Sequence, residues 1–143
     1  MKTVRDMLNA KQGETHTIAP DETVFRALEK MAENEVGALL VLKDEKVVGI
    51  ISERDYARKV ILKGASSLDT PVSKIMTRDV IYVGPDQTVE ECMALMTDKR
   101  IRHLPVVVDR RLAGMISIGD VVKAVIADRE FAIRQLESYI SGG

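Results

Sequence analysis

The sequence has little of what most catalytic or disulfide-stabilised proteins depend on. A single cysteine excludes an internal disulfide and any metal site built from several thiolates. Two histidines, with no glycine-rich phosphate loop and no H-E-x-x-H motif, supply no set of nucleophile, base and orienting group. We therefore expect a protein that is not an enzyme and holds neither a metal nor a catalytic cofactor.

Aromatic residues, excess charge and long apolar runs are also scarce. Aromatics make up 3% of the 143 residues, so the core must consist mainly of aliphatic side chains and methionine. The net charge of −1 argues against general binding to nucleic acids or membrane surfaces. No run is long enough to span a bilayer, and no signal-type apolar segment follows residues 1–5. These features indicate a cytoplasmic globular protein.

What the sequence does contain is a duplication. Residues 18–61 align with residues 83–126 at a constant offset of 65, without a gap and with 14 identities in 44 positions. The match is densest between G-I-I-S-E-R-D at 49–55 and G-M-I-S-I-G-D at 114–120. The chain therefore carries one module twice, with the same polar motif in each copy.

Each repeat is predicted to form a strand, a helix, a hairpin and a second helix. The elements expected in the first repeat are a strand at 15–19, a helix from Val24, a hairpin of 38–42 and 47–51, and a helix at 52–62. Those expected in the second are a strand at 80–83, a helix from Val89, a hairpin of 104–108 and 112–116, and a helix at 117–127. This pattern predicts an α+β fold of two β-α-β-β-α repeats packed about a pseudo-two-fold axis, with one cleft per repeat.

The duplication also sets the expected boundaries. We place the first repeat at 1–62, a linker at 63–71, the second repeat at 72–127, and a separate C-terminal helix and tail at 128–143. This last helix has no counterpart in the first repeat. One of its sides carries Ala132, Ile133, Leu136, Tyr139 and Ile140. Such an apolar stripe needs a partner surface, and a second copy of the chain is the economical partner, so we expect a homodimer.

The repeated S-x-x-D motif has two interpretations. Ser52 with Asp55, and Ser117 with Asp120, have the spacing of a helix cap with an acidic residue at the third helical position. The same geometry fixes a carboxylate that can accept two hydrogen bonds from a ribose diol. Both interpretations can hold at once. Thr88 and Glu91 have the spacing of a further capping box. The first copy keeps Thr23 but has Arg26 in place of Glu91, so we expect its cap to be weaker.

Together with the segment K-R-I-R-H-L-P-V-V at 99–107, the two motifs resemble a pair of cystathionine-β-synthase (CBS) domains, a Bateman module, over roughly residues 4–127. The resemblance implies a regulatory module that binds AMP, ADP, ATP or sometimes NAD or S-adenosyl compounds in clefts between the repeats. Such modules sense energy or redox state in signalling and are commonly disc-like dimers. With no catalytic domain attached, the expected output is a regulated partner protein.

The resemblance also assigns ligand-binding residues. It implies that Asp120 and Asp55 hold the ribose, that Ser117 and Ser52 assist them, and that Arg102 and His103 reach the phosphate. It further places Ile18 and Val83 in strand segments that line the adenine and ribose, and Pro105 beside the phosphate-binding pair.

The two copies diverge at the phosphate position. The first copy has Gly37 and Ala38 where the second has Arg102 and His103, whereas Arg54 stands opposite Gly119 and is expected to serve either cleft. We therefore expect two unequal clefts, with tighter AMP binding at Asp120.

An alternative is a nucleic-acid-associated module that uses a basic cluster within residues 99–111. The cluster consists of Lys99, Arg100, Arg102, Arg110 and Arg111. The net charge and the scarcity of stacking aromatics disfavour this alternative.

Overall fold

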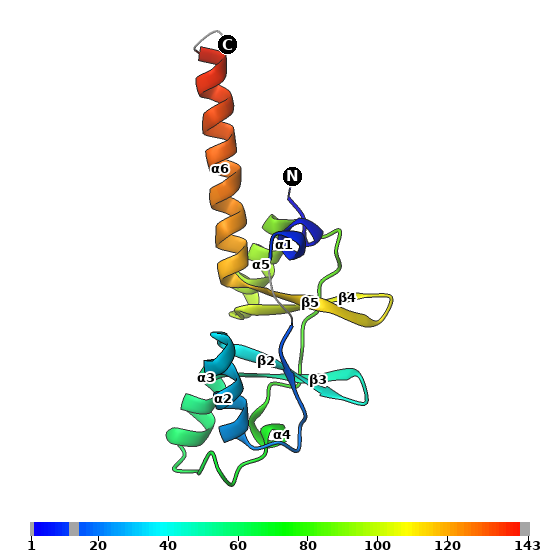
Figure 1. Ribbon diagram of the computed structural model, residues 1–143, viewed down its shortest axis with the longest axis vertical. Helices are drawn as coiled ribbons and strands as arrows, with labels where there is room; N and C mark the ends of the chain where they lie inside the picture. Colours follow the sequence, from blue (N-terminus) through cyan, green and yellow to red (C-terminus); the bar gives the residue numbers. More distant parts are fainter. Residues whose placement is uncertain (1, 12–14, 141–143) are drawn as a thin grey trace. The chain divides into compact units, whose positions relative to one another are not determined.

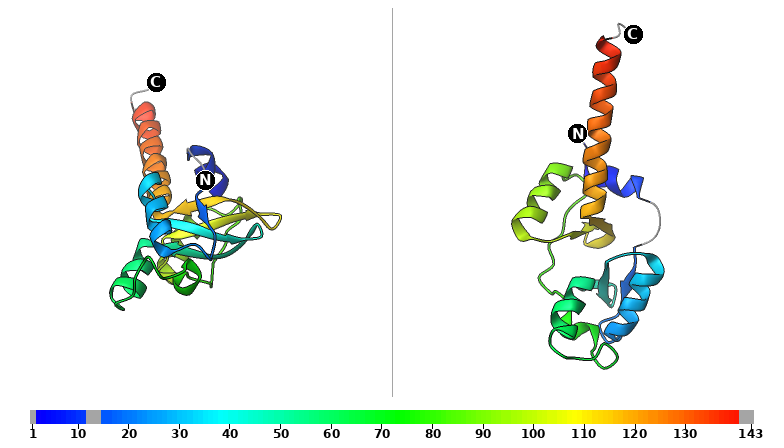
Figure 2. Two further views of the ribbon diagram at one scale, coloured as in Figure 1. Left: turned by 60° about the horizontal axis from the view of Figure 1, so that its bottom comes forward. Right: turned by 90° about the vertical axis from the view of Figure 1, so that its left-hand side faces the viewer.

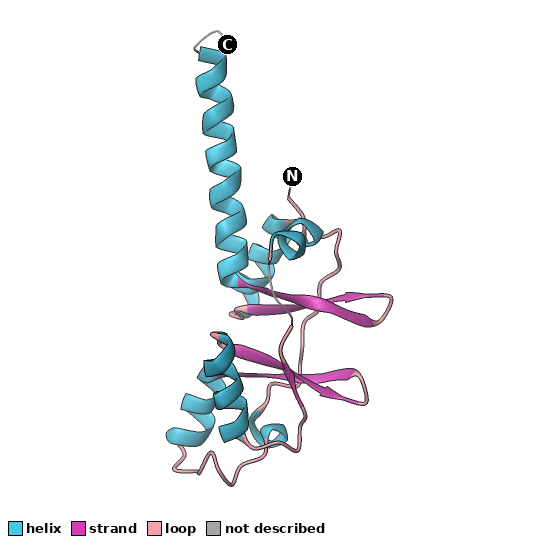
Figure 3. Cartoon of the chain, viewed as in Figure 1, coloured by secondary structure: helices cyan, strands magenta, loops and turns pink. Residues whose placement is uncertain are grey.

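The computed structural model describes residues 2–11 and 15–140, and its mixture of helices and strands confirms the predicted α+β class. Figure 1 shows the elements along the chain, and Figure 3 shows helices and strands in separate colours. The elements are α1 (Val4–Ala10), β1 (Thr17–Ile18), α2 (Val24–Asn34), β2 (Ala38–Lys43), β3 (Lys46–Ser52), α3 (Glu53–Tyr56), the π-helical turn η1 (Ala57–Ile61), α4 (Val72–Ile75), α5 (Val89–Lys99), β4 (His103–Val108), β5 (Arg111–Ser117) and α6 (Ile118–Ile140).

The chain forms two compact units that do not follow the order of the sequence. Among described residues, the first unit contains 2–11, 82–109 and 113–140, and the second contains 15–81 and 110–112. Helix α1 therefore packs with the second repeat, where the Val4 N–H donates to the Gln87 carbonyl at 2.8 Å. Helix α4 packs with the first repeat, where the Val72 N–H donates to the Glu22 carbonyl at 2.8 Å. Each short helix thus covers the repeat that it does not precede.

The second unit is built on a three-stranded sheet of order β1-β2-β3. Strand β1 pairs parallel with β2, with Ile18 opposite Val41, and β2 pairs antiparallel with β3. One stripe of α2 is buried in the same core, as its spacing predicts. The buried residues of that stripe are Val24, Ala27 and Met31. The strand expected at 15–19 is shorter in the structure, where only Thr17 and Ile18 pair with the sheet.

The first unit repeats this plan around the hairpin of β4 and β5. Its counterpart of β1 is a single parallel bridge between Val83 and Val106, each 65 residues beyond Ile18 and Val41. The strand expected at 80–83 is therefore reduced to one residue. Helix α5 buries Cys92 in the core, and this burial raises the pKa of the thiol. Cys92 is a packed core residue.

The duplication extends to backbone conformation. Glu35 and Arg100, 65 residues apart, end α2 and α5 in the left-handed region with φ of 53° and 55°. Both hairpins turn through two residues of positive φ, as type I′ turns require. The turn residues are Asp44 and Glu45 with φ of 52° and 66°, and Asp109 and Arg110 with φ of 50° and 66°. The predicted hairpins are confirmed in both copies.

The helices that follow the hairpins differ from the prediction. The expected helix at 52–62 is a single α-turn, α3, continued by the π-helical turn η1. The expected break between helices at 117–127 and 128–141 is wrong, because α6 runs without interruption for 23 residues (Figure 2). No glycine or proline lies between Val121 and Ile140, so nothing in the sequence stops the helix. No helix within the described ranges is both long and apolar enough to cross a membrane.

Gly49 shows why the motif begins with glycine in the first copy. Residues Ile50 and Thr77 exchange backbone hydrogen bonds of 3.0 and 2.8 Å. A Cβ at Gly49 would lie 2.8 Å from the Thr77 carbonyl oxygen and 2.7 Å from the Met76 sulfur. The absence of a side chain therefore permits the close crossing of these two segments.

We predict that Gly49→Ala destabilises the protein by about 1–3 kcal/mol, because the added methyl overpacks against backbone. Urea unfolding followed by circular dichroism measures this change. Gly37→Ala is the matched control, since a Cβ there meets no atom within 4 Å. Equal effects of the two substitutions would contradict the assigned role of Gly49.

Candidate functional site

Each S-x-x-D motif forms a complete capping box where a strand passes into a helix. In the first unit, Ser117 Oγ accepts the Asp120 N–H at 3.2 Å, and Asp120 Oδ2 accepts from Ser117 N and Oγ at 2.8 and 3.0 Å. In the second, Ser52 Oγ accepts the Asp55 N–H at 3.1 Å, and Asp55 Oδ2 accepts from Ser52 N and Oγ, both at 3.0 Å. The helix-cap interpretation is therefore correct in both copies. Because each cap uses only Oδ2 of its aspartate, the other carboxylate oxygen, Oδ1, can accept a hydrogen bond from a different group.

The Asp120 carboxylate is held by a lysine from the opposite end of the chain. Lys11 Nζ lies 2.9 Å from Asp120 Oδ2 and donates to the Met115 carbonyl at 2.8 Å. Burial raises the pKa of Asp120, but the Ser117 hydrogen bonds and the Lys11 ammonium outweigh it and leave the pKa below its ordinary value. Asp120 is therefore ionised at neutral pH. No hydrogen bond from any described residue reaches its Oδ1.

The Asp55 carboxylate has a local cation instead. Lys59, one turn further along, places Nζ 3.1 Å from Asp55 Oδ1 and also donates to the Ile75 carbonyl at 2.9 Å. Thr77 Oγ1 donates to the same Oδ1 at 3.4 Å. Both oxygens of Asp55 are therefore engaged, whereas Asp120 keeps one available. The two motifs are equal as helix caps and unequal as acceptors.

The sequence analysis did not identify three residues that contact the two aspartates, namely Lys11, Lys59 and Thr77. Lys59 stands four residues after Asp55, a spacing typical of helical ion pairs, and this signal was available. Ala124 occupies the corresponding place in the second copy, so the cation for Asp120 comes from elsewhere. Lys11 is 109 residues from Asp120, and no local pattern connects them.

Arg102 and His103 lie at the start of the hairpin, where Arg102 directly precedes β4 and His103 is its first residue. Burial lowers the pKa of His103, nearby Lys11 and Arg102 lower it further, and Asp120 opposes them. His103 is therefore neutral at pH 7. The Arg102 carbonyl accepts the Ile118 N–H at 2.9 Å, while its side chain is exposed.

Val83 and Pro105 are adjacent in the same unit, because the Val83 N–H donates to the Pro105 carbonyl at 3.0 Å. The two other predicted residues belong to the second unit. Ile18 is buried in β1, whereas Arg54 is exposed on α3 and forms no ion pair within the described part of the chain. The predicted residues are thus divided between the units, six in the first and four in the second.

A groove of about 610 Å³ surrounds the ion pair of Lys11 and Asp120 in the first unit. It lies between α1 and α6, and Lys2, Lys11 and Lys123 line it together with Asp6 and Asp120. Met7 and three alanines supply its apolar wall. No group of three or more metal-binding side chains occurs among the residues that the structure describes. The groove therefore offers ammonium groups and an ionised carboxylate beside an apolar surface.

We predict that Lys11→Met destabilises the protein at pH 7 by about 0.5–1 kcal/mol, the range for a partly exposed ion pair. A carboxyl whose pKa is lowered in the folded state contributes stability above its unfolded pKa, and this contribution disappears as the pH falls through the folded value. The difference between variant and wild type should therefore shrink below about pH 4, near the ordinary value of 3.8. Urea unfolding at several pH values measures it. Lys123→Met, in the same groove but in no ion pair with a described residue, should show no such pH dependence, and a pH-independent loss for Lys11→Met would contradict the prediction.

Comparison with known proteins agrees with the resemblance seen in the sequence. Residues 3–62 and 72–127 match the CBS domain family. A mitochondrial CBS domain-containing protein of Arabidopsis thaliana, CBSX3, is 43% identical over 150 residues, which cover 99% of this chain and 73% of that protein. A solved structure from Burkholderia ambifaria, described as a candidate signal-transduction protein with CBS domains, is 50% identical with a TM-score of 0.87 and covers 89% of this chain and 96% of that one.

A more distant structure shows the same fold. The CBS domain pair of protein MJ0100 was solved in complex with 5′-methylthioadenosine and S-adenosyl-L-methionine. It is 24% identical to this chain, with a TM-score of 0.79, and the match covers 90% of this chain and 98% of that one.

Proposed function

The chain belongs to the CBS domain family, and we propose that it is a regulatory module that binds an adenine nucleotide and modulates a partner protein without catalysing a reaction. The observation that carries the proposal is the Asp120 carboxylate, which is ionised and fixed by its capping box. No described residue donates to its Oδ1. A ribose diol has two hydroxyl donors that suit such an acceptor.

The cations near Asp120 support a phosphate-bearing ligand. Lys11 lies against the carboxylate, and Lys2 and Lys123 line the same groove. Ammonium groups form charge-assisted hydrogen bonds with phosphate oxygens. Arg102 and neutral His103 would add donors from the hairpin. We propose AMP, ADP or ATP as the ligand class, with NAD as an alternative, and no resident metal or catalytic cofactor.

The two aspartates support unequal binding. Asp55 Oδ1 already accepts from Lys59 and Thr77, so a ribose there would have to displace existing partners. At Asp120 the corresponding oxygen needs no such exchange, because the Lys11 contact is to Oδ2. We therefore propose tighter binding at Asp120, with Ser117 as its companion and Val83 and Pro105 beside it. Ser52, Arg54 and Ile18 would take the corresponding places at Asp55.

The proposal also covers the accommodation of adenosine by the fold, the oligomeric state and the cellular location. The CBS pair solved with two adenosine compounds indicates that the fold can accommodate adenosine, while the choice of ligand here rests on this chain's own residues. A homodimer and a cytoplasmic location belong to the same proposal. The relative from A. thaliana is named as mitochondrial, so fractionation of the native protein is the appropriate test of location.

We predict that Asp120→Ala weakens AMP binding roughly tenfold to 100-fold, the value of hydrogen bonds to a charged acceptor, and that Asp55→Ala weakens it less. Isothermal titration calorimetry measures both. Glu91→Ala is the matched control, because it removes the acidic member of the α5 capping box and lies outside the proposed site. Glu91→Ala should lower the free energy of unfolding by about 0.5–1 kcal/mol, as the loss of either aspartate cap should. It should leave AMP binding unchanged. Equal losses in both aspartate variants, or none, would contradict the asymmetry.

A thermal-shift panel tests the ligand class. AMP, ADP, ATP or NAD present at 100 times its dissociation constant should stabilise the folded state by about 2.7 kcal/mol, because ligand binds only that state. Stabilisation by oligonucleotides alone would instead favour the nucleic-acid alternative.

A further inference from the structure

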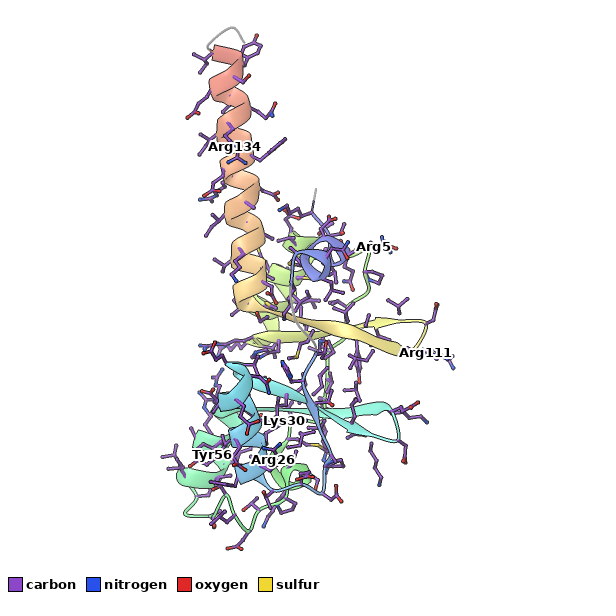
Figure 4. All side chains as sticks on the ribbon, in the orientation of Figure 1. Arg5, Arg26, Lys30, Tyr56, Arg111 and Arg134 are labelled. Atoms are coloured by element: carbon purple, nitrogen blue, oxygen red, sulfur yellow. The ribbon has the colours of Figure 1, made fainter. Side chains whose placement is uncertain are left out.

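The C-terminal half of α6 is not covered by any other residue that the structure describes. All residues from 131 to 140 are exposed, and Figures 1 and 2 show this part of α6 extending beyond α1 and α5. Arg134, labelled in Figure 4, lies in this exposed part. The exposed apolar residues are Phe131 at 59%, Ile133 at 54%, Leu136 at 62%, Tyr139 at 85% and Ile140 at 81%. Because large apolar side chains gathered on one exposed surface mark an interaction site, this segment is a candidate docking surface.

The apolar residues of α6 follow a heptad pattern on one face. Ile126, Ile133 and Ile140 are seven residues apart, and Val122 and Leu136 occupy the second apolar position of the same repeat, with Arg129 between them. We name these six residues the α6 seam. Val121 and Ala124, which pack into the first unit, lie outside it. Val122 and Ile126 are 49% and 50% exposed, so the seam is open along its full length.

We propose that the α6 seam pairs antiparallel with the α6 seam of a second copy. In this arrangement Val122 packs against Ile140 of the second copy, Ile126 against Leu136, and Arg129 against Ile133. The two-fold axis repeats these layers, so each seam residue is used on both chains and the assembly closes as a dimer. The inference deepens the proposed homodimer and rests on the exposed face of α6. Lys123, at the edge of that face, also lines the groove beside Asp120.

The charges select the antiparallel orientation. A parallel pair would place Arg129 directly against Arg129 of the second copy in an apolar layer, and a buried pair of like charges is unfavourable. The antiparallel register places Lys123 opposite Glu137 of the second copy. At the two-fold axis it brings the two Glu130 side chains together, with Arg129 of each chain beside them to balance their charge. Lys123 and Glu137 form no ion pair within the described chain. Four residues per dimer, two lysines and two glutamates, would therefore gain partners at the edge of the seam.

Sedimentation velocity of the full chain tests the surface. Wild type should be a dimer, and Ile133→Lys or Leu136→Lys should weaken dimerisation at least roughly tenfold, as for a central interface residue. Phe131→Lys is the matched control, because it is equally exposed on the same helix and lies off the seam. If both seam variants remain dimers, the α6 seam is not the interface, and the proposed homodimer is unaffected. A monomeric wild type would overturn both the seam and the homodimer. AMP titration of Ile133→Lys reports separately on the nucleotide proposal.

A charge exchange tests the orientation. Lys123→Glu and Glu137→Lys should each weaken the dimer, because each places like charges opposite one another. The double variant should recover most of the loss. Two single substitutions that add without recovery would overturn the antiparallel register, since only that register brings residues 123 and 137 together. Thermal unfolding by circular dichroism confirms that every variant remains folded.

Discussion

The hydrogen bonds exchanged by serine and aspartate at the end of each hairpin are the interaction on which the rest of the structure depends. They end β3 and β5, begin α3 and α6, and fix a carboxylate at a helix N-terminus, where negative charge is favourable. The aspartate side chain is already ordered by folding, so a ligand would not have to restrict it. A structural cap and a binding group can therefore be the same residue.

Each fixed carboxylate has a lysine as its counter-ion, and this lysine comes from a different part of the chain in each copy. Lys59 belongs to the same helical segment as Asp55, whereas Lys11 follows α1 and reaches Asp120 across 109 residues. This contact exists because α1 packs on the second repeat. The N-terminal segment thereby controls the electrostatics of Asp120, and the duplicated motif acquires a different environment in each unit.

Helix α6 connects the two proposed interactions. Asp120 lies in its first turn, and the seam occupies the following residues to Ile140. A continuous helix is a rigid element, so a ligand at Asp120 and a second copy at the seam would act on the same body. Each would favour a given position of α6 only by its differential affinity for that position.

The sequence alone determined the duplication, the hairpins, the caps and the buried stripes of α2 and α5, because each depends on residues close together in the chain. It also identified Asp55 and Asp120, since the cap requires a fixed spacing. Only the tertiary structure decided the exchange of α1 and α4, the position of Lys11 and the availability of Asp120 Oδ1. It also showed that the chain continues through residue 128 as one helix, where an expected boundary between repeats had suggested a break. These features depend on which distant segments pack together, and packing is set by the three-dimensional complementarity of surfaces that no local pattern encodes.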